Sequence, residues 1–189
     1  MRKVTFGCAN SLDNYIARPD GSVDWLLWGK EAAQYMKEYW KTIDTILMGR
    51  KTYEVTLSMS KGKSNPSKGM KTYVFSRTLK ASAGGEVEIV STDAAEFVRR
   101  LKGEEGKDIC LMGGGEFAKT LLEENLVDEI GLNIHPILLG RGVPLFLEMN
   151  HQIDLELLDC KVFKNGCVLV SYRVKNSRRK RSRRSGARR

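Results

Sequence analysis

Short apolar runs recur along the chain, each bounded by glycine or polar residues. Runs of this length with such boundaries predict buried β-strands, and the segment 31–41 is the first clear exception. Its apolar residues, among them Ala32, Tyr35 and Tyr39, recur at the three- and four-residue spacings of one helix face. The runs that predict strands are 4–9, 15–17, 45–48, 72–75, 87–90, 109–112 and 127–134.

Further helices are predicted between several of these strands. One begins near Lys51, after the glycine that ends a buried run, and another spans 116–124. Between them, Thr92 or Asp93 can cap a third helix, because both side chains accept a hydrogen bond from a first-turn N–H group. The segment 58–70 is rich in Ser, Lys and Gly, so we expect it to be disordered or to form a mobile lid.

The last two apolar runs, 155–163 and 167–174, flank Asn165 and Gly166, a dipeptide that favours a tight hairpin turn. The earlier strands alternate with helices, which indicates an α/β fold. We expect a mixed, mostly parallel sheet with helices on both faces, to which the hairpin adds antiparallel strands at one edge.

The composition is that of one globular domain. The chain has 189 residues, of which 41% are hydrophobic and 29% are charged, and this length can bury a core without disulfides or metals. No apolar run approaches the roughly 18 residues that a membrane-spanning helix needs. The N-terminus also lacks the long apolar segment of a secretory signal, so we expect a cytoplasmic protein.

The net charge of +9 is concentrated at the C-terminus. Of the 32 basic side chains, nine lie in 175–189 with no acid among them, which leaves 23 against 23 acidic side chains in the rest of the chain. We therefore expect a folded domain over 1–174 and a basic, disordered tail over 175–189. A nucleic-acid contact, if there is one, depends on this tail alone.

The cysteines and histidines are too few and too scattered for a metal centre. None of the four cysteines belongs to a C-x-x-C pair, and the chain has two histidines. Free thiols in a reducing compartment are expected, with no disulfide framework and no metal site.

Two strand-to-helix junctions carry the candidate chemistry. At the first, a buried run ends at Gly49, and Arg50, Lys51 and Thr52 open the next helix. A helix start presents free backbone N–H groups and the positive end of the helix dipole, so this junction suits a phosphate group. The alternative is an ordinary turn with exposed bases.

At the second junction, Gly113, Gly114 and Gly115 follow a strand. Glycines allow positive φ and close approach of a ligand or another backbone, although the dinucleotide fingerprint G-x-G-x-x-G is absent. Together the two junctions indicate a pyrophosphate held at the carboxyl ends of neighbouring strands. Ser76 and Arg77, at another strand end, suit the 2′-phosphate of NADPH or else form a solvated turn.

These motifs occur in the order typical of one family. The ordered set includes Ser11-Leu12-Asp13, the segment 46–54, Ser76-Arg77, the triple glycine and the segment 136–142. Over roughly residues 3–173 the chain resembles the dihydrofolate reductase-like superfamily. Within it, the chain is most similar to single-domain proteins related to the C-terminal reductase domain of the bifunctional riboflavin-biosynthesis enzymes.

The resemblance implies that NADPH is the hydride donor. It also implies that the loop 10–25 closes over nicotinamide and substrate. Of the two acids that flank this loop, Asp13 is the predicted proton donor and Asp24 a predicted substrate contact, with turn residues as the alternative. Trp25 is predicted to line a pocket for a planar substrate or else to pack at the hinge of the loop. Relatives of this kind often form two-fold homodimers. The cofactor-binding residues carried over from the family are Gly49, Arg50, Lys51, Thr52, Ser76, Arg77, Gly113, Gly114 and Gly115.

Departures from the family patterns concern the substrate. Dihydrofolate reductases carry an acidic residue in the first helix, where counting back from Met48 gives Ala33 here. Of the D-N-P-x-L-x-x-R element of the riboflavin reductases, only Asn65-Pro66 remains. We therefore predict an NADPH-dependent reductase of a small planar heterocycle, pterin- or pyrimidine-like, with weak turnover of either family substrate. The alternative is a non-catalytic nucleotide-binding protein of the same fold, tethered to nucleic acid by its tail.

Overall fold

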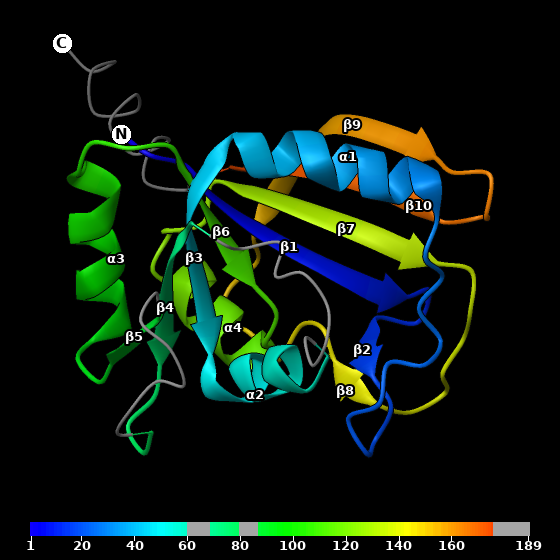
Figure 1. Cartoon of the computed structure of the whole chain (residues 1–189), viewed down its shortest axis with the longest axis horizontal. Coiled ribbons are helices and arrows are strands. Elements are labelled where there is room, and N and C mark those ends of the chain that lie inside the picture. Colours follow the sequence, from blue (N-terminus) through cyan, green and yellow to red (C-terminus); the bar gives the residue numbers. More distant parts are fainter. Residues whose placement is uncertain (60–68, 80–86, 176–189) are drawn as a thin grey trace, which may run out of the picture.

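The computed structural model describes residues 1–59, 69–79 and 87–175, which build one eight-stranded sheet with helices on both faces (Figure 1). The predicted tail beyond Lys175 and most of the predicted lid lie outside the described residues. The strands of the sheet are β1 (Val4–Ser11), β3 (Ile43–Gly49), β4 (Lys71–Phe75), β5 (Val87–Val90), β6 (Asp108–Met112), β7 (Glu129–His135), β9 (Asp154–Val162) and β10 (Val168–Lys175).

The strand order is β5-β4-β3-β6-β1-β7-β10-β9, and the first six strands run parallel. The hairpin of β9 and β10 joins the edge of β7 in antiparallel orientation. Its turn is tight, because Gly166 adopts φ +86° and donates its N–H to the carbonyl of Phe163. The predicted α/β fold with a mixed, mostly parallel sheet and a terminal antiparallel hairpin is therefore confirmed.

Among the described residues, four helices cover the sheet: α1 (Lys30–Lys41), α2 (Arg50–Met59), α3 (Ala94–Gly103) and α4 (Gly115–Glu123). The α2 residue Tyr53 packs with Ile46 and Met48 of β3, on the face that α1 also covers. We call this the α1 face. On the other face, α3 and α4 bury Val98 and Leu121 against the larger core.

The helix starts follow the capping chemistry that the sequence indicates. The Asp93 carboxylate accepts the N–H of Glu96 at 2.8 Å, so Asp93 rather than Thr92 caps α3. In contrast, the N-cap residue of α4 is Gly114, which offers no side chain to the first turn of the helix. The N-terminus of α4 therefore keeps unpaired N–H groups toward the carboxyl edge of the sheet.

A small second sheet lies beside the main one and pairs β2 (Tyr15–Ala17) with β8 (Val143–Pro144). The two residues of β8 give no periodicity in the sequence, and they form a strand only because β2 lies beside them. Gly142 is needed at this contact, because a Cβ there would lie 2.2 Å from the carbonyl oxygen of Ala17.

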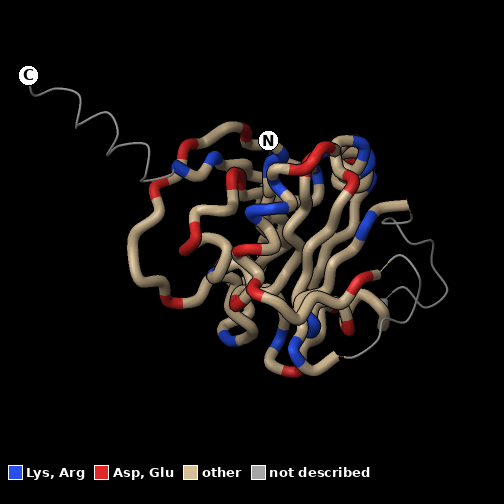
Figure 2. Tube along the Cα trace, turned by 90° about the vertical axis from the view of Figure 1, so that its left-hand side faces the viewer, with Lys and Arg blue, Asp and Glu red and all other residues tan. Residues whose placement is uncertain are grey.

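Basic and acidic residues are interspersed along the described chain (Figure 2), as the balanced charge of the domain predicts. Within the described residues, no helix combines the length and apolar composition that a membrane-spanning segment requires. All four cysteines are unpaired. Burial raises the pKa of Cys110 to about 11, which keeps this thiol protonated and unreactive at neutral pH.

Candidate functional site

The two strand-to-helix junctions lie next to each other. Strand β3 pairs with β6 so that Met48 is opposite Met112, and the glycines that follow both strands emerge at the same edge. The side chain of Thr52 packs against the glycine turn, because a Cβ on Gly113 would lie 2.6 Å from the Thr52 Oγ1. The first turn of α2 and the turn before α4 therefore form one site.

The site is made of backbone in unusual conformations. Gly113 and Gly114 adopt φ of +66° and +60°, a region that residues with a Cβ rarely occupy. This turn directs the first N–H groups of α4 outward, beside the first turn of α2. Two neighbouring helix N-termini, each with unpaired N–H groups and a positive dipole end, can hold a diphosphate.

Each position of the glycine triplet requires glycine for a different reason. Gly115 lies against the chain near β8, where a Cβ would come within 3.0 Å of the Leu145 carbonyl oxygen. At Gly114 the nearest atom, the Thr52 Oγ1, would be 3.5 Å away, so the positive φ alone requires glycine there. The packing of Gly113 and Gly115 would require glycine even without a ligand.

The basic residues near this site differ in their availability. The Arg50 guanidinium forms an ion pair with Glu54 at 2.7 Å, one helical turn along α2. Lys51 and Arg77 are exposed and form no ion pair with the described residues. A ligand phosphate can bind these two cations directly, whereas at Arg50 it would compete with a carboxylate.

Ser76 closes the turn that follows β4. Its Oγ accepts the N–H groups of Leu79 at 2.9 Å and Thr78 at 3.2 Å, and its own N–H donates to the Val90 carbonyl. These contacts fix the end of β4 and leave the Arg77 side chain extending from a rigid turn.

Asp13 links two loops. It accepts the Ser11 hydroxyl at 2.6 Å and the N–H groups of Leu139 and Gly140 at 3.1 and 2.7 Å. The Ser11 hydrogen bond is the largest cause that lowers the pKa of this carboxyl, and the two backbone donors add to it. A carboxylate held ionised in this way is a poor proton donor, so these contacts argue against the catalytic role expected from the sequence.

The two predicted substrate contacts have different environments. Asp24 forms an ion pair with Arg18 at 2.7 Å, and its side chain is 63% exposed. Trp25 is only 6% exposed and packs edge-on against His135, with ring centroids 5.3 Å apart. Trp25 therefore forms a buried contact between the loop 10–25 and His135, whereas the ion pair of Asp24 with Arg18 stabilises the exposed turn of the same loop.

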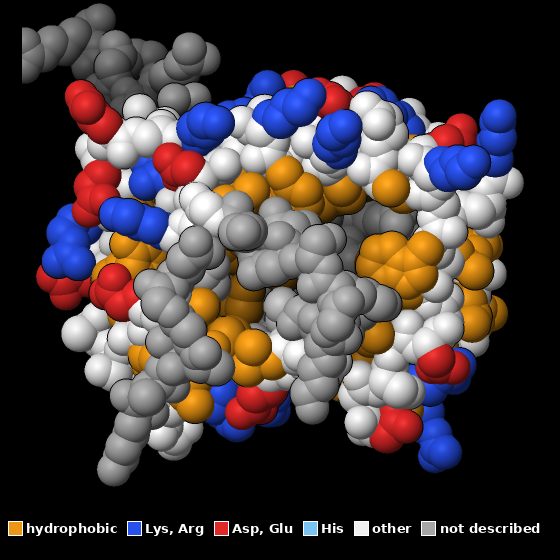
Figure 3. Space-filling model, viewed as in Figure 1, with side chains coloured by type: hydrophobic (Ala, Val, Ile, Leu, Met, Phe, Trp, Pro, Cys, Tyr) orange, Lys and Arg blue, Asp and Glu red, His pale blue; other side chains and the backbone are white. Residues whose placement is uncertain are grey.

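An open floor on the α1 face is a feature that the sequence reasoning missed. Gly7 and Gly131 are paired neighbours on β1 and β7, and a Cβ on either would meet no heavy atom of the described chain within 4 Å. Helix α1 lies on this face, yet none of its residues is fully buried. In Figure 3, hydrophobic side chains gather below the basic residues of α1 on this side of the molecule.

His135 and Asn133 border this floor on β7. Nδ1 of His135 accepts the Leu27 N–H at 3.2 Å, so the ring carries its proton on Nε2. Burial lowers the pKa of His135, which keeps the ring neutral. Nδ2 of Asn133 lies 3.3 Å from Nε2, and Oδ1 of Asn133 is buried without a partner among the described residues. An Nε2–H donor requires an oxygen acceptor, so we assign the amide in the opposite orientation, with its oxygen toward Nε2 and its NH₂ group in the position without a partner.

No acidic side chain of α1 faces the sheet. Ala33, the position predicted by counting, is exposed. Glu31 accepts the Lys164 N–H at 2.8 Å, at the hairpin turn. The residues that pack toward the sheet are Ala32, Tyr35, Tyr39 and Trp40.

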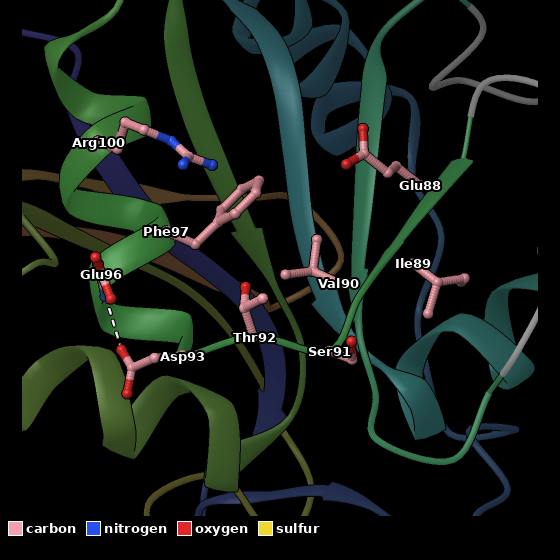
Figure 4. Close-up of a pocket in the computed structure, with 9 residues that line it drawn as sticks. All are labelled: Glu88, Ile89, Val90, Ser91, Thr92, Asp93, Glu96, Phe97 and Arg100. Atoms are coloured by element: carbon pink, nitrogen blue, oxygen red, sulfur yellow. Dashed lines mark hydrogen bonds between the residues drawn. The ribbon is translucent and has the colours of Figure 1, made fainter.

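A cavity of about 360 Å³ lies elsewhere, between β5 and α3. In Figure 4, Arg100 and Phe97 extend from α3 toward β5, and Glu88 extends from the strand toward them. The Arg100 guanidinium lies 5.3 Å from the centre of the Phe97 ring. None of the predicted site residues lines this cavity. Its wall at Val90 nevertheless lies beside the turn of Ser76, because the Ser76 N–H donates to the Val90 carbonyl.

The comparisons with known proteins agree with this architecture. Residues 2–169 match the model of the RibD C-terminal domain family. The Bacillus subtilis protein YyaP is 32% identical over 181 residues, which cover 91% of this chain and 95% of YyaP. A protein from Shewanella sp. PV-4 named for riboflavin biosynthesis has a TM-score of 0.80 and 27% identity, over 93% of this chain and 100% of that one. Enterococcus faecalis dihydrofolate reductase, complexed with NADP(H), has a TM-score of 0.67 over 92% of this chain and 97% of its own, and at 18% identity it shows the fold alone.

Proposed function

Because the chain belongs to the RibD C-terminal domain family, we propose that it is an NADPH-dependent reductase that transfers a hydride to a small planar heterocycle. The observation that carries this proposal is the contact of Thr52 with the Gly113 turn. It joins the starts of α2 and α4 into one anion site at the ends of β3 and β6, and β6 pairs directly with β1, the strand that carries Gly7 of the open floor.

The cofactor fits the residues present. The N–H groups at the starts of α2 and α4 would hold the pyrophosphate, with the Thr52 hydroxyl and Lys51 beside it. Arg77 would bind the 2′-phosphate, and the adenosine end would lie across the turn of Ser76 toward the cavity at Val90. NADPH supplies the hydride when bound, and the protein supplies orientation and a site from which water is excluded.

The substrate would lie flat on Gly7 and Gly131, beneath α1. In the amide orientation that the His135 Nε2–H requires, the NH₂ group of Asn133 takes the buried position that has no partner among the described residues, and it would donate to a ring carbonyl or ring nitrogen. Tyr39 and Trp40 offer aromatic surface from the helix. This environment suits a neutral, flat ring with an acceptor at its edge, such as a pyrimidine or pterin, better than a protonated ring that needs a carboxylate.

The proton that follows the hydride would come from water. Asp13 would hold the loop after β1 against Leu139 and Gly140, and so close one end of the site. Four unpaired cysteines suit a reducing cytoplasm as the location of the protein.

Titration with NADPH tests this proposal. Tryptophan fluorescence should be quenched, and at about 100 times the dissociation constant the protein should gain about 2.7 kcal/mol of stability, measurable as a rise in Tm. NADPH oxidation with a panel of pyrimidines and dihydropterins then identifies the acceptor. Failure of NADPH to bind would refute the cofactor assignment, and binding without turnover of any acceptor would favour a non-catalytic nucleotide-binding protein.

For that alternative, the sequence offers the nine basic residues of 175–189. A protein tethered to nucleic acid should lose salt-sensitive binding of DNA or RNA when residues 176–189 are deleted, while NADPH binding stays unchanged.

A further inference from the structure

The imidazole ring of His135 is held by contacts from three separate parts of the chain. His135 is the last residue of β7 and is only 2% exposed. Its Nδ1 lies 3.2 Å from the backbone nitrogen of Leu27, in the loop before α1, and 3.4 Å from the Sγ of Cys167, directly after the hairpin turn. The Trp25 ring packs against it at 89° between the ring planes. These contacts fix the ring where the end of β7, the start of α1 and the β9–β10 turn meet (Figure 1).

The two contacts at Nδ1 decide which ring nitrogen carries the proton. The Leu27 backbone N–H can only donate, so Nδ1 must accept. Burial raises the pKa of the Cys167 thiol, which therefore stays protonated and is a second donor to the same nitrogen. Burial also lowers the pKa of His135, so the ring is neutral at neutral pH. A neutral imidazole has one ring proton, and here it lies on Nε2.

This Nε2–H group determines the orientation of the neighbouring amide. Asn133 lies on the same face of β7, and one polar atom of its amide is 3.3 Å from Nε2. An amide NH₂ group facing Nε2–H would leave two donors without an acceptor, whereas the amide oxygen accepts the proton. The NH₂ group then takes the buried position that has no partner among the described residues. Because side chains two positions apart on a strand share a face, this donor lies next to Gly131 of the open floor.

We propose that His135 is a positioning residue that sets the substrate specificity of the open floor. It makes Asn133 present its NH₂ group rather than its oxygen. The site therefore selects a flat ring whose edge carries a hydrogen-bond acceptor there, either a carbonyl oxygen or an unprotonated ring nitrogen. A ring with an N–H or amino group at that edge is rejected, because two donors would face each other. This inference rests on the proposed function only in assigning the floor to the substrate.

A purely structural role explains this arrangement less well. A buried amide donor without a partner destabilises a fold, and an apolar side chain of similar size would avoid that cost. His135 also receives two donors and an aromatic contact, more than its packing alone requires. Both observations are explained if the unpaired donor is kept for a ligand and the ring is kept to orient it.

The ring tautomer can be measured without any ligand. ¹⁵N NMR distinguishes the two neutral tautomers by the chemical shifts of the two ring nitrogens. The chain has two histidines and His151 is exposed, so the variant His151→Gln leaves the signal of His135 alone. We expect the Nε2–H form at neutral pH. An Nδ1–H form or a charged ring would overturn the proposal, and this result does not depend on whether NADPH binds.

Discrimination between two probes tests the consequence for recognition. Pterin and 2,4-diaminopteridine share one ring system, but their pyrimidine edges carry opposite donor–acceptor patterns. The wild type, without NADPH and with it, should bind pterin about 10- to 100-fold more tightly in a fluorescence titration. His135→Phe keeps an aromatic ring against Trp25 but has neither nitrogen, so it should remove most of this preference.

Three further variants separate orientation of the amide from structural damage. His135→Gln can accept the Leu27 N–H with its oxygen and donate to Asn133 with its NH₂ group, so it should retain the preference. Asn133→Asp offers an oxygen in both positions and should reverse the preference, even if His135→Phe does not fold. His151→Gln, at the exposed histidine, should change nothing.

The ratio of the two affinities decides the outcome. If His135 were only structural, His135→Phe would weaken both probes equally and leave the ratio unchanged, which would overturn the proposal. Equal binding of the two probes by the wild type, or binding of neither, would also overturn it. So would an unchanged preference in Asn133→Asp.

Discussion

The two halves of the candidate site are built from different material. The half that we propose for phosphate binding consists of backbone at two strand-to-helix junctions, with Gly113 and Gly114 in positive φ and Thr52 packed against them. The substrate half consists of side chains and gaps on the α1 face, where Asn133 and His135 border the floor of Gly7 and Gly131.

This difference has a physical reason. Phosphate groups recur in every nucleotide cofactor, and a helix start binds them with N–H groups that any sequence possesses. A substrate ring is recognised by a few polar atoms whose partners are otherwise missing. Binding at the first half should therefore tolerate most side-chain changes except at its glycines. Binding at the second half should respond to the replacement of a single polar atom.

The largest effect is expected at the glycine turn. Gly113→Ala places a Cβ 2.6 Å from the Thr52 Oγ1 and strains a backbone at φ +66°. Displacing either part of the turn should raise the NADPH dissociation constant about 100-fold, or roughly 2.7 kcal/mol, as measured by fluorescence titration. Gly69→Ala is the control, because Gly69 has φ +85° but a Cβ there would meet no heavy atom of the described chain within 4 Å. Equal losses in both variants would mean that strain alone is responsible.

The substrate half should respond to the exchange of one atom. Asn133→Asp replaces the NH₂ donor with an oxygen while it keeps an acceptor for the His135 Nε2–H. We expect kcat/KM for the acceptor substrate to fall about 10- to 100-fold, because a substrate acceptor loses its partner, and NADPH affinity to stay unchanged. A parallel loss of NADPH affinity would show that the two halves are not separable.

Substitution of the two arginines should distinguish binding of the 2′-phosphate from binding of the pyrophosphate. Arg77→Ala should weaken NADPH about tenfold and leave NADH unchanged, because only NADPH carries the 2′-phosphate. Arg50→Ala should weaken both cofactors to a smaller and equal extent, since Arg50 is already paired with Glu54 at the start of α2. Competition assays with both nucleotides measure the ratio, and the reverse pattern would exchange the two assignments.

The smallest effect is expected for substitution of Asp13, and it should appear as a change in thermal stability. Its pKa is lowered in the folded chain, mainly by Ser11, so its contribution is present above the unfolded pKa and is lost as pH falls through the folded pKa. Asp13→Asn should therefore lower Tm at neutral pH, and the difference from the wild type should vanish in acid. Asp24→Asn, at an exposed ion pair with Arg18, should change Tm less. A full loss of turnover in Asp13→Asn with unchanged Tm would restore the catalytic role.

Much of the fold could be predicted from local patterns. The apolar runs gave the main strands to within one or two residues at most ends, and Asn165-Gly166 marked the turn of the hairpin. The two strand-to-helix junctions that we propose for phosphate binding could also be located, because each is a contiguous segment, with a glycine and two cations at 49–51 and three glycines at 113–115.

Other features have no local signal. Strand β8 exists only because β2 lies beside it, and the two backbone N–H groups that donate to Asp13 are 126 and 127 positions away. Trp25 was expected to contact substrate, but its packing against His135 depends on a strand more than 100 residues later.

The sequence by itself determined the alternation of strands and helices, the helix starts that suit phosphate and the balanced charge of the domain. These follow from periodicity, capping and composition, which act over a few residues. Only the tertiary structure decided which polar atoms remain without partners, that Gly7 and Gly131 form one floor, and that β9 is an uncovered edge. Those features arise because the sheet brings distant segments into register, and a register is a property of pairs of strands that neither strand encodes alone.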